Sequence, residues 1–328
     1  MKITNLKETP SLIEKTLTLI ETSFKYSKEN HFKTDFAPLV NERNHENCFI
    51  AVENENVVAH VGYLEKEIAL GEEKFLIGLV GGIAVDEQKR GEGIFSQIFT
   101  HVLSEKRDDI AFFILWSDLE KLYKKFGFFL CGQQYELPYE KGSQTYQQTK
   151  YSLLSEEDKN QIQKLYQNKF SSTYLSLTRD SQEWNKLSEI NSADLFIKKS
   201  SQIDNYFFMN KGQDLTDIIY EYATLEKEMT HYGKVWMGAP LMDTDLLQYQ
   251  FFLSPGATKL FASFVQAYTG GAVSIRDINL MKQEVFFDFN EETLSLETED
   301  FLRGIFGPGM FEEFGELRPF FISGLDSI

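Results

Sequence analysis

The sequence predicts an α/β protein in which a mixed central sheet is flanked by helices and followed by a second, α+β unit. In the first 140 residues, apolar segments alternate in the order helix, three strands, helix, strand, helix, strand. Near residue 90 a glycine-bearing loop joins a strand to an amphipathic helix. The chain has 328 residues, whereas one domain commonly has about 150. We therefore predict two units, residues 1–140 and residues 141–328.

Apolar spacing defines the elements of the first unit. Residues 10–25 carry apolar side chains at helical intervals, and the stripe from Ile94 to Leu103 is wide enough to pack on a sheet. Asn54, Glu55 and Asn56 form a turn between two strand-like segments. Strands are expected at residues 48–53, 57–68, 73–85, 110–116 and 128–138, with a short helix over 119–126.

The second unit has a weaker pattern. Residues 139–150 are polar without periodicity, which is typical of a linker. Two helices and a meander of three strands follow, in an order that indicates a degenerate copy of the first unit without its glycine loop. These elements are expected at residues 155–169, 180–188, 193–199, 203–210 and 215–223.

Composition limits the partners and the compartment. A formal charge of −17 argues against nucleic acid, because phosphates would be repelled. The acidic surface suits cationic small molecules or basic peptides, or simply keeps the chain in solution. No apolar stretch reaches the ~18 residues of a membrane span, and the N-terminus lacks a signal peptide. Cys48 and Cys131 are expected to be buried free thiols, which indicates the cytoplasm. We predict no metal site.

The loop at residues 88–93, Gln-Lys-Arg-Gly-Glu-Gly, has the properties of an anion site. It precedes a helix whose first N–H groups lack partners and whose dipole is positive at that end. Gly91 and Gly93 let a phosphate approach the backbone, and Lys89 and Arg90 add positive charge. The alternative is a strand–helix joint that binds nothing. We predict that the loop binds a pyrophosphate.

A second segment completes a pattern. Residues 110–116 are continuously apolar, as in a strand buried on both faces. The helix after this strand carries Tyr123 and ends at Gly127, which Phe128 follows. The spacings Gln-x-x-Gly-x-Gly and Tyr-x-x-x-Gly-Phe, in this order, resemble motifs of the GNAT acetyltransferase superfamily, whose members bind acetyl-CoA. The resemblance covers residues 1–140. The layout of the whole chain resembles families with an active first GNAT domain and a degenerate second one.

The resemblance implies a donor site. The strand that ends at Val85 would bulge away from its neighbour and hold the pantetheine arm, with a backbone N–H polarising the thioester. Tyr123 would lie beside the sulfur as the proton donor; its alternative role is packing on the sheet. The residues implied in donor binding are Ile83, Ala84, Val85, Gln88, Lys89, Arg90, Gly91, Glu92, Gly93, Ile94 and Phe95.

The general base is the open question of this sequence. Many superfamily members carry a glutamate on the strand before the loop, where this chain has Gly81 and Gly82. In the enhanced-intracellular-survival type of aminoglycoside acetyltransferase, which the tandem layout resembles, the terminal carboxylate reaches the active site. This chain ends in an unusually apolar tail, so we hypothesise that the Ile328 carboxylate does the same. The alternative is a tail that only closes the core, and water could also relay the proton. Other candidate bases are Glu65, Glu67, Asp118, Glu120 and His60.

These observations predict transfer of an acetyl group from acetyl-CoA to a primary amine of a small molecule or peptide. Trp116 and Ser117, at the end of a strand, are expected where the acceptor enters. The alternatives are a non-catalytic protein that binds or senses acyl-CoA, and a transferase of longer acyl groups. The sequence does not indicate the acceptor or the oligomeric state.

Overall fold

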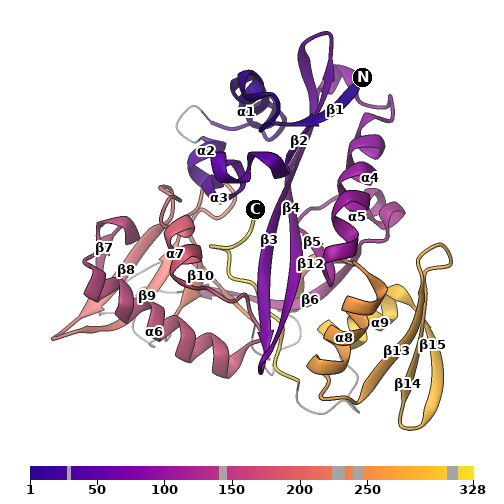
Figure 1. Ribbon diagram of the computed structural model, residues 1–328. Coiled ribbons are helices and arrows are strands. Elements are labelled where there is room, and N and C mark those ends of the chain that lie inside the picture. Colours follow the sequence, from indigo (N-terminus) through magenta and orange to yellow (C-terminus); the bar gives the residue numbers. More distant parts are fainter. Residues whose placement is uncertain (28–30, 140–145, 224–232, 239–246, 309–316) are drawn as a thin grey trace.

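The computed structural model describes residues 1–27, 31–139, 146–223, 233–238, 247–308 and 317–328. In these residues the strands form a twelve-stranded sheet and a separate three-stranded sheet, with helices packed around them (Figure 1). The C-terminus lies in the middle of the molecule, beside β3 and β4, while the N-terminus lies at its periphery (Figure 1). No helix in these ranges is long and apolar enough to cross a membrane.

The first half contains all the predicted elements and three further short ones. The additions are the edge strand β1 and the single-turn helices α2 and α3, which are too short to give a periodic signal. In chain order the elements are β1 (Lys2–Asn5), α1 (Ile13–Ser23), α2 (Phe32–Asp35), α3 (Ala37–Val40), β2 (Cys48–Glu53), β3 (Asn56–Leu70), β4 (Glu73–Val85), α4 (Ile94–Lys106), β5 (Phe112–Leu115), α5 (Glu120–Tyr123) and β6 (Phe129–Tyr139).

The second half begins inside the segment predicted as a linker. Residues 140–145 of that segment lie outside the described residues, but Gln147–Thr149 form strand β7, which pairs with β8. The remaining elements are α6 (Glu156–Thr173), α7 (Ser181–Leu187), β8 (Asp194–Lys199), β9 (Ile203–Met209), β10 (Ile218–Tyr222), β11 (Gly233–Met237), β12 (Leu247–Pro255), α8 (Thr258–Tyr268), β13 (Val273–Asn279), β14 (Glu284–Phe289), β15 (Glu292–Glu297) and α9 (Thr298–Phe306).

The large sheet joins the two halves of the chain. Its order is β1-β2-β3-β4-β5-β12-β6-β11-β10-β9-β8-β7, so β12 lies between two strands of the first half. Phe252 of β12 is paired with Leu115 of β5 on one side and with Leu130 of β6 on the other. Hydrogen bonding therefore continues across the sheet from both sides of residue 140. The division into two units at that residue stays a prediction.

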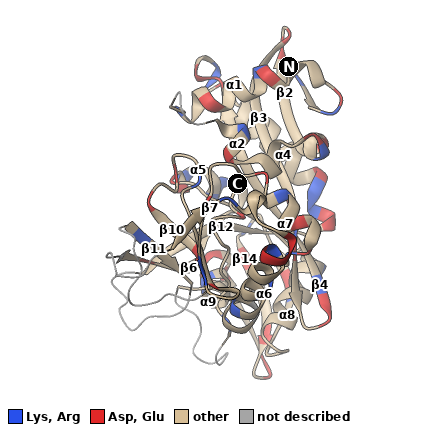
Figure 2. Cartoon of the chain, turned by 90° about the vertical axis from the view of Figure 1, so that its left-hand side faces the viewer, with Lys and Arg blue, Asp and Glu red and all other residues tan. Residues whose placement is uncertain are grey.

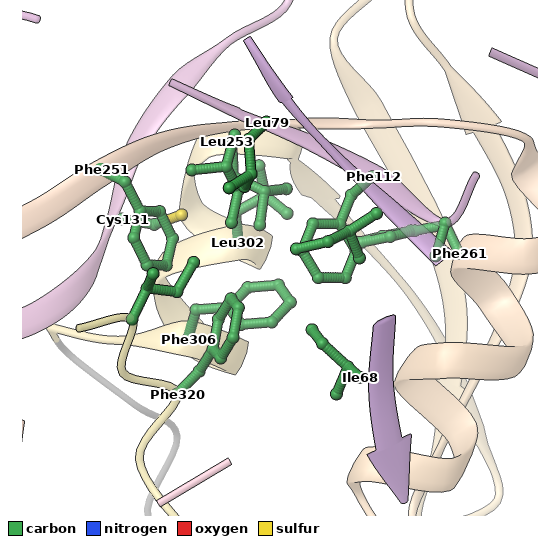
Figure 3. Close-up of a cluster of buried hydrophobic side chains, with 14 of the residues drawn as sticks. Ile68, Leu79, Phe112, Cys131, Phe251, Leu253, Phe261, Leu302, Phe306 and Phe320 are labelled. Atoms are coloured by element: carbon green, nitrogen blue, oxygen red, sulfur yellow. The ribbon is translucent and has the colours of Figure 1, made fainter. Parts of the chain in front are cut away.

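The largest core cluster draws on distant parts of the chain. Phe112 of β5 has its ring centroid 6.2 Å from that of Phe261, 5.9 Å from that of Phe306 and 5.9 Å from that of Phe320 (Figure 3). Phe320 belongs to the C-terminal tail and is fully buried. Burying a phenylalanine side chain stabilises a fold by about 1.5–3 kcal/mol. This packing explains why the tail is apolar.

Charged side chains are spread over the molecule. Asp and Glu occur on elements of both halves, among interspersed Lys and Arg (Figure 2). Both cysteines are buried and free, as predicted.

Candidate active site

Strand β4 bulges at the point where it leaves β5. Its pairing with β3 joins Gly81 to Gly62 and Ala84 to His60, so two residues of β4 face one residue of β3 in between. Gly82, inside the bulge, has φ +59°, a conformation that favours glycine. Pairing with β5 occurs only at Gly78 and Leu79 among the described residues. The end of β4 therefore has backbone groups free to bind an extended ligand.

His60 holds the bulge in place. It is fully buried on β3, and its Nδ1 lies 2.7 Å from the carbonyl oxygen of Gly82. Because a carbonyl only accepts, Nδ1 carries the proton in this contact. Burial lowers the pKa of His60 to about 4, although the hydrogen bond with Gly82 opposes the shift. The side chain is therefore neutral at physiological pH, and it is not part of the cavity wall described next.

A cavity of about 920 Å³ runs along the splayed end of β4. Its wall contains the β4 residues 80–85, the start of α4, the α5 region and the C-terminal residues Ser327 and Ile328. Most of the predicted donor-binding residues line it, but Gln88 and Glu92 are exposed and do not. The residues of that prediction in the wall are Ile83, Ala84, Val85, Lys89, Arg90, Gly91, Gly93, Ile94 and Phe95.

The loop before α4 is open toward this cavity. Gly91 has φ +86° and Gly93 has φ +79°, and a Cβ built on Gly91 would meet no atom within 4 Å. Gly93 is the N-cap of α4, whose first-turn N–H groups have no partner within the helix. Lys89 is paired with Glu53 at 3.0 Å and with Glu92 at 3.3 Å, and hydrogen bonds to both carboxylates raise its pKa. The loop therefore offers backbone donors, space and the exposed cation of Arg90.

Tyr123 lies on α5 and lines the same cavity. Its side chain is almost fully buried and packs edge-on against Phe95 and Phe99, with centroid distances of 6.0 and 5.7 Å. Burial raises the pKa of Tyr123 to about 12, although a hydrogen bond with Ser117 opposes the shift. The phenol is therefore protonated at neutral pH.

The C-terminus of the chain lies against β4, beside the bulge. A Cβ built on Gly81 would lie 2.6 Å from the carboxyl carbon of Ile328 and 2.7 Å from a carboxyl oxygen. The terminal carboxyl group thus occupies the space that a side chain at position 81 would fill. Any residue larger than glycine at this position would displace it.

The other candidate bases lie in different places. Asp118 lines the cavity, as do Trp116 and Ser117. Glu65, Glu67 and Glu120 do not line it.

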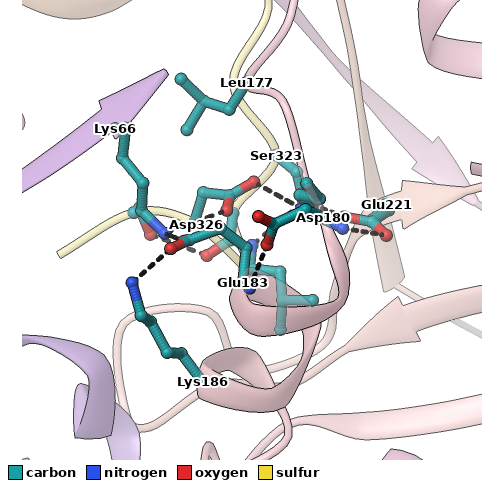
Figure 4. A network of polar contacts seen from close by, with 12 residues as sticks. Lys66, Leu177, Asp180, Glu183, Lys186, Glu221, Ser323 and Asp326 are labelled. Carbon is teal, nitrogen blue, oxygen red and sulfur yellow. Dashed lines mark hydrogen bonds and ion pairs between the residues drawn. The ribbon is translucent and has the colours of Figure 1, made fainter. Parts of the chain in front are cut away.

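Buried ion pairs hold the tail that ends at Ile328. Arg179 has a side chain only 1% exposed, and its Nη2 lies 2.6 Å from Glu221 and 2.6 Å from Asp326. Burial alone would lower the pKa of Arg179, but Asp326 and Glu221 outweigh this effect and raise it. The guanidinium also stacks over Tyr166, 4.1 Å from the ring centroid. Figure 4 shows how Glu221, Ser323 and Asp326 converge on this point.

Lys66 and Lys211 complete this arrangement. We name Arg179, Lys66 and Lys211 the C-terminal clamp. The Lys66 ammonium, reaching in from β3, lies 3.9 Å from Asp326 and also pairs with Glu183. Lys211 is fully buried, and its side chain binds the backbone of the tail. Its ammonium donates hydrogen bonds to the carbonyl oxygens of Gly324 (2.9 Å), Leu325 (3.1 Å) and Ser327. Ile328 follows these contacts and lines the cavity together with Ser327.

The sequence motifs found the loop and Tyr123 but not the clamp. Arg179, Lys211 and Asp326 stand in segments with no recognisable motif. Buried charges are rare and need partners. Nothing in their neighbouring residues shows that they are buried.

Comparison with known proteins agrees with the geometry. The family model of the acetyltransferase (GNAT) domain matches residues 6–131. No curated protein matches the sequence. Among solved structures, the chain is similar to a GCN5-related N-acetyltransferase from Kribbella flavida, with 13% identity, a TM-score of 0.58 and coverage of 90% of this chain and 84% of the other.

Two further structures give the same result. A GCN5-related N-acetyltransferase from Anabaena variabilis has 14% identity and a TM-score of 0.56, and Eis1 from Mycobacterium abscessus has 13% identity and a TM-score of 0.55. Each similarity covers 90% of this chain and 85% of the other. At these identities the likeness concerns the fold.

Proposed function

Since the chain carries a domain of the GNAT acetyltransferase family in residues 6–131, we propose that it transfers an acetyl group from acetyl-CoA to a primary amine of a small molecule or peptide. The observation that carries this proposal is the position of the Ile328 carboxylate. It lies against the β4 bulge, in the same cavity wall as Tyr123. The proposed base and the proposed hydrogen-bond donor to the sulfur thus line one cavity.

The residues present fit acetyl-CoA as the donor. The free edge of β4 after Leu79 can hydrogen-bond an extended pantetheine arm as an added strand would. The space over Gly91 and the N-terminus of α4 suit a diphosphate, with Arg90 beside it. A backbone N–H near the bulge would polarise the thioester carbonyl.

The Ile328 carboxylate, Tyr123 and water then have separate roles in the proton transfers. The amine attacks in its neutral form, after its ammonium proton has passed to water, and the Ile328 carboxylate accepts a second proton from the nitrogen as the new C–N bond forms. The C–S bond breaks, and the sulfur leaves as a thiolate beside Tyr123. Because the phenol, with a pKa of about 12, is a weaker acid than a thiol of ordinary pKa about 8.5, Tyr123 acts best by donating a hydrogen bond to the sulfur. Water supplies the proton that finally neutralises the thiolate.

The C-terminal clamp supports this role for the terminus. A base must be held close to the proton it removes, and a frayed terminus is not held. Lys211 binds carbonyl oxygens of the tail and Arg179 pairs with Asp326, so the tail is held up to Ser327, the residue before the terminal carboxylate. Burying these charges is costly unless every partner is present. A tail that merely closed the core would need no such arrangement.

The deciding experiment adds one glycine after Ile328. The clamp contacts stay, but the carboxylate moves one residue away from Gly81. We expect kcat to fall by about 100-fold or more, while calorimetry shows unchanged affinity for coenzyme A and thermal unfolding is unchanged. Undiminished kcat would remove Ile328 from the mechanism.

Calorimetry with coenzyme A also tests the activity itself. The absence of binding would overturn the donor site. Binding without thiol release from acetyl-CoA, across a broad amine panel, would favour the alternative of a non-catalytic acyl-CoA-binding protein. Faster turnover with longer acyl-CoA donors would replace acetyl by a longer acyl group.

A further inference from the structure

Six aromatic side chains outside the glycine loop and the donor-binding residues line the cavity, and we name them the aromatic wall. They come from the segment after α1, from the end of β5 and from β11. They are Phe24, Tyr26, Phe32, Phe36, Trp116 and Trp236. None of them belongs to the loop or to the donor-binding part of β4, so this wall is free to contact the second substrate.

Phe32 is the centre of this wall. Its ring centroid lies 4.8 Å from that of Phe36, 6.2 Å from that of Phe24 and 6.1 Å from that of Tyr26. A Cβ built on Gly82 would lie 3.1 Å from the tip of the Phe32 ring. The aromatic wall therefore begins at the β4 bulge, directly beside the place of acetyl transfer.

Two members of the wall are only partly buried. Phe24 is 39% exposed, although large apolar side chains are mostly buried in this chain. Trp236 is half-buried against the core, and its indole N–H donates to Glu136 at 3.1 Å, so its polar edge is satisfied. Exposed aromatic rings that line a cavity are suited to contacts with an apolar or cationic ligand.

The cavity wall carries charges of both signs, with Asp118 among the anions. The cations Lys89 and Arg90 belong to the glycine loop, whereas the Ile328 carboxylate meets Gly81, next to the Gly82 that Phe32 approaches. Asp214 acts electrostatically on Tyr26 of the aromatic wall. Lys211 stands behind Phe36, 5.0 Å from the ring centroid, with its ammonium bound to carbonyl oxygens of the tail. The carboxylates near the aromatic wall therefore favour a cationic ligand.

Resting on the proposed function, we propose that the acceptor is an arylalkylamine: a primary amine on an aromatic or comparably apolar body. Its ring would contact Phe24 and the aromatic side chains around Phe32, and its amino group would lie near the Ile328 carboxylate. A polyhydroxylated amine would leave hydroxyl groups facing rings without hydrogen-bond partners, which is unfavourable. A polyamine would bring additional charges into the same apolar wall.

A panel of four amines tests this proposal: 2-phenylethylamine, tryptamine, spermidine and kanamycin. We expect kcat/KM with acetyl-CoA to be about 10-fold or more higher for the two arylalkylamines, a ratio typical of filling an apolar pocket. Binding of each of the four amines is measured separately by calorimetry, with and without coenzyme A. Preference for spermidine or kanamycin in both assays would overturn the proposal.

A variant at an exposed position links the preference to the wall. Phe24→Ser should lower kcat/KM and affinity for 2-phenylethylamine by about 10-fold, with unchanged affinity for coenzyme A. The matched control is Leu153→Ser, a side chain that is 76% exposed and is not in the cavity wall. It should change neither quantity. Equal losses for all four amines in Phe24→Ser would contradict a specificity role.

The two proposals fail in different ways. If coenzyme A does not bind but 2-phenylethylamine does, the acetyltransferase proposal fails and the arylalkylamine site stands. If acetyl-CoA is consumed with spermidine or kanamycin and 2-phenylethylamine does not bind, the acetyltransferase proposal stands and the acceptor class is wrong.

Discussion

The glycine loop at residues 88–93 and the tail at residues 319–328 reach one cavity by opposite means. The loop is largely exposed, and backbone conformation gives it its properties: positive φ at two glycines and the start of a helix. The tail is largely buried, and side chains more than a hundred residues away hold it. Donor recognition can thus be encoded locally, while the position of the terminal carboxylate depends on the whole fold.

The largest effect is expected from a substitution in the glycine loop that weakens binding of coenzyme A. Gly91→Glu places a side chain at φ +86° and a negative charge where a diphosphate would lie. Like charges in a binding site cost several kcal/mol, so affinity for coenzyme A should fall on the order of 1,000-fold. Calorimetry measures this change.

Gly71→Glu is the matched control for this variant. Gly71 has φ +64° in the turn between β3 and β4, has open space around its Cα and lies outside the cavity wall. It introduces the same charge and similar strain, so coenzyme affinity should be unchanged. If both variants lost affinity equally, the loop would not be the diphosphate site.

The second test removes a buried ion pair that holds the tail. Arg179→Met leaves Glu221 and Asp326 buried without their partner. Removing one member of a buried ion pair typically costs about 3–5 kcal/mol, which urea unfolding would measure. Arg276→Met, which removes an exposed pair with Asp288, should cost about 1 kcal/mol or less. Equal losses for the two variants would show that the clamp does not hold the tail.

The third test concerns His60, which holds the bulge of β4. The folded-state pKa of His60 is about 4 and its ordinary value is 6.5, so between these values only the unfolded chain binds the proton. Stability should therefore fall as the pH is lowered from about 6.5 to 4, by about 3 kcal/mol from this group.

His60→Gln should remove this part of the pH dependence, measured by urea unfolding at several pH values. The absolute stability of the variant does not enter the comparison, because only its slope with pH is read. His101→Gln, at an exposed position on α4, should keep the slope of the natural protein. An unchanged slope in His60→Gln would show that His60 is not held neutral in the folded state.

The smallest effect is expected from Tyr123, the proposed hydrogen-bond donor to the departing thiolate. Tyr123→Phe removes one hydrogen bond to a departing thiolate, so kcat should fall by about 10- to 100-fold, with little change in the KM for acetyl-CoA. Tyr249→Phe, at a position 40% exposed on β12 and outside the cavity wall, serves as the control. Full activity in Tyr123→Phe would assign this side chain to packing alone.

Local patterns predicted most of the first half of the fold. The strand from Cys48 to Glu53 has the expected bounds, and β3, β4, α4 and β6 lie where periodicity placed them. β1 was missed because four residues cannot show alternation reliably. The position of β12 between β5 and β6 was also missed, because partner choice depends on distant residues and not on the pattern of the strand itself.

The sequence by itself determined the glycine loop, the tyrosine helix and the family they indicate, since turns, caps and short motifs act over a few residues. Tertiary structure placed the Ile328 carboxylate against Gly81, which the family resemblance had only suggested. It alone decided that Arg179 and Lys211 hold the tail and that six aromatic side chains line one cavity. These contacts join segments far apart in the chain. Their stability comes from burial and charge pairing in the folded molecule, which no local pattern encodes.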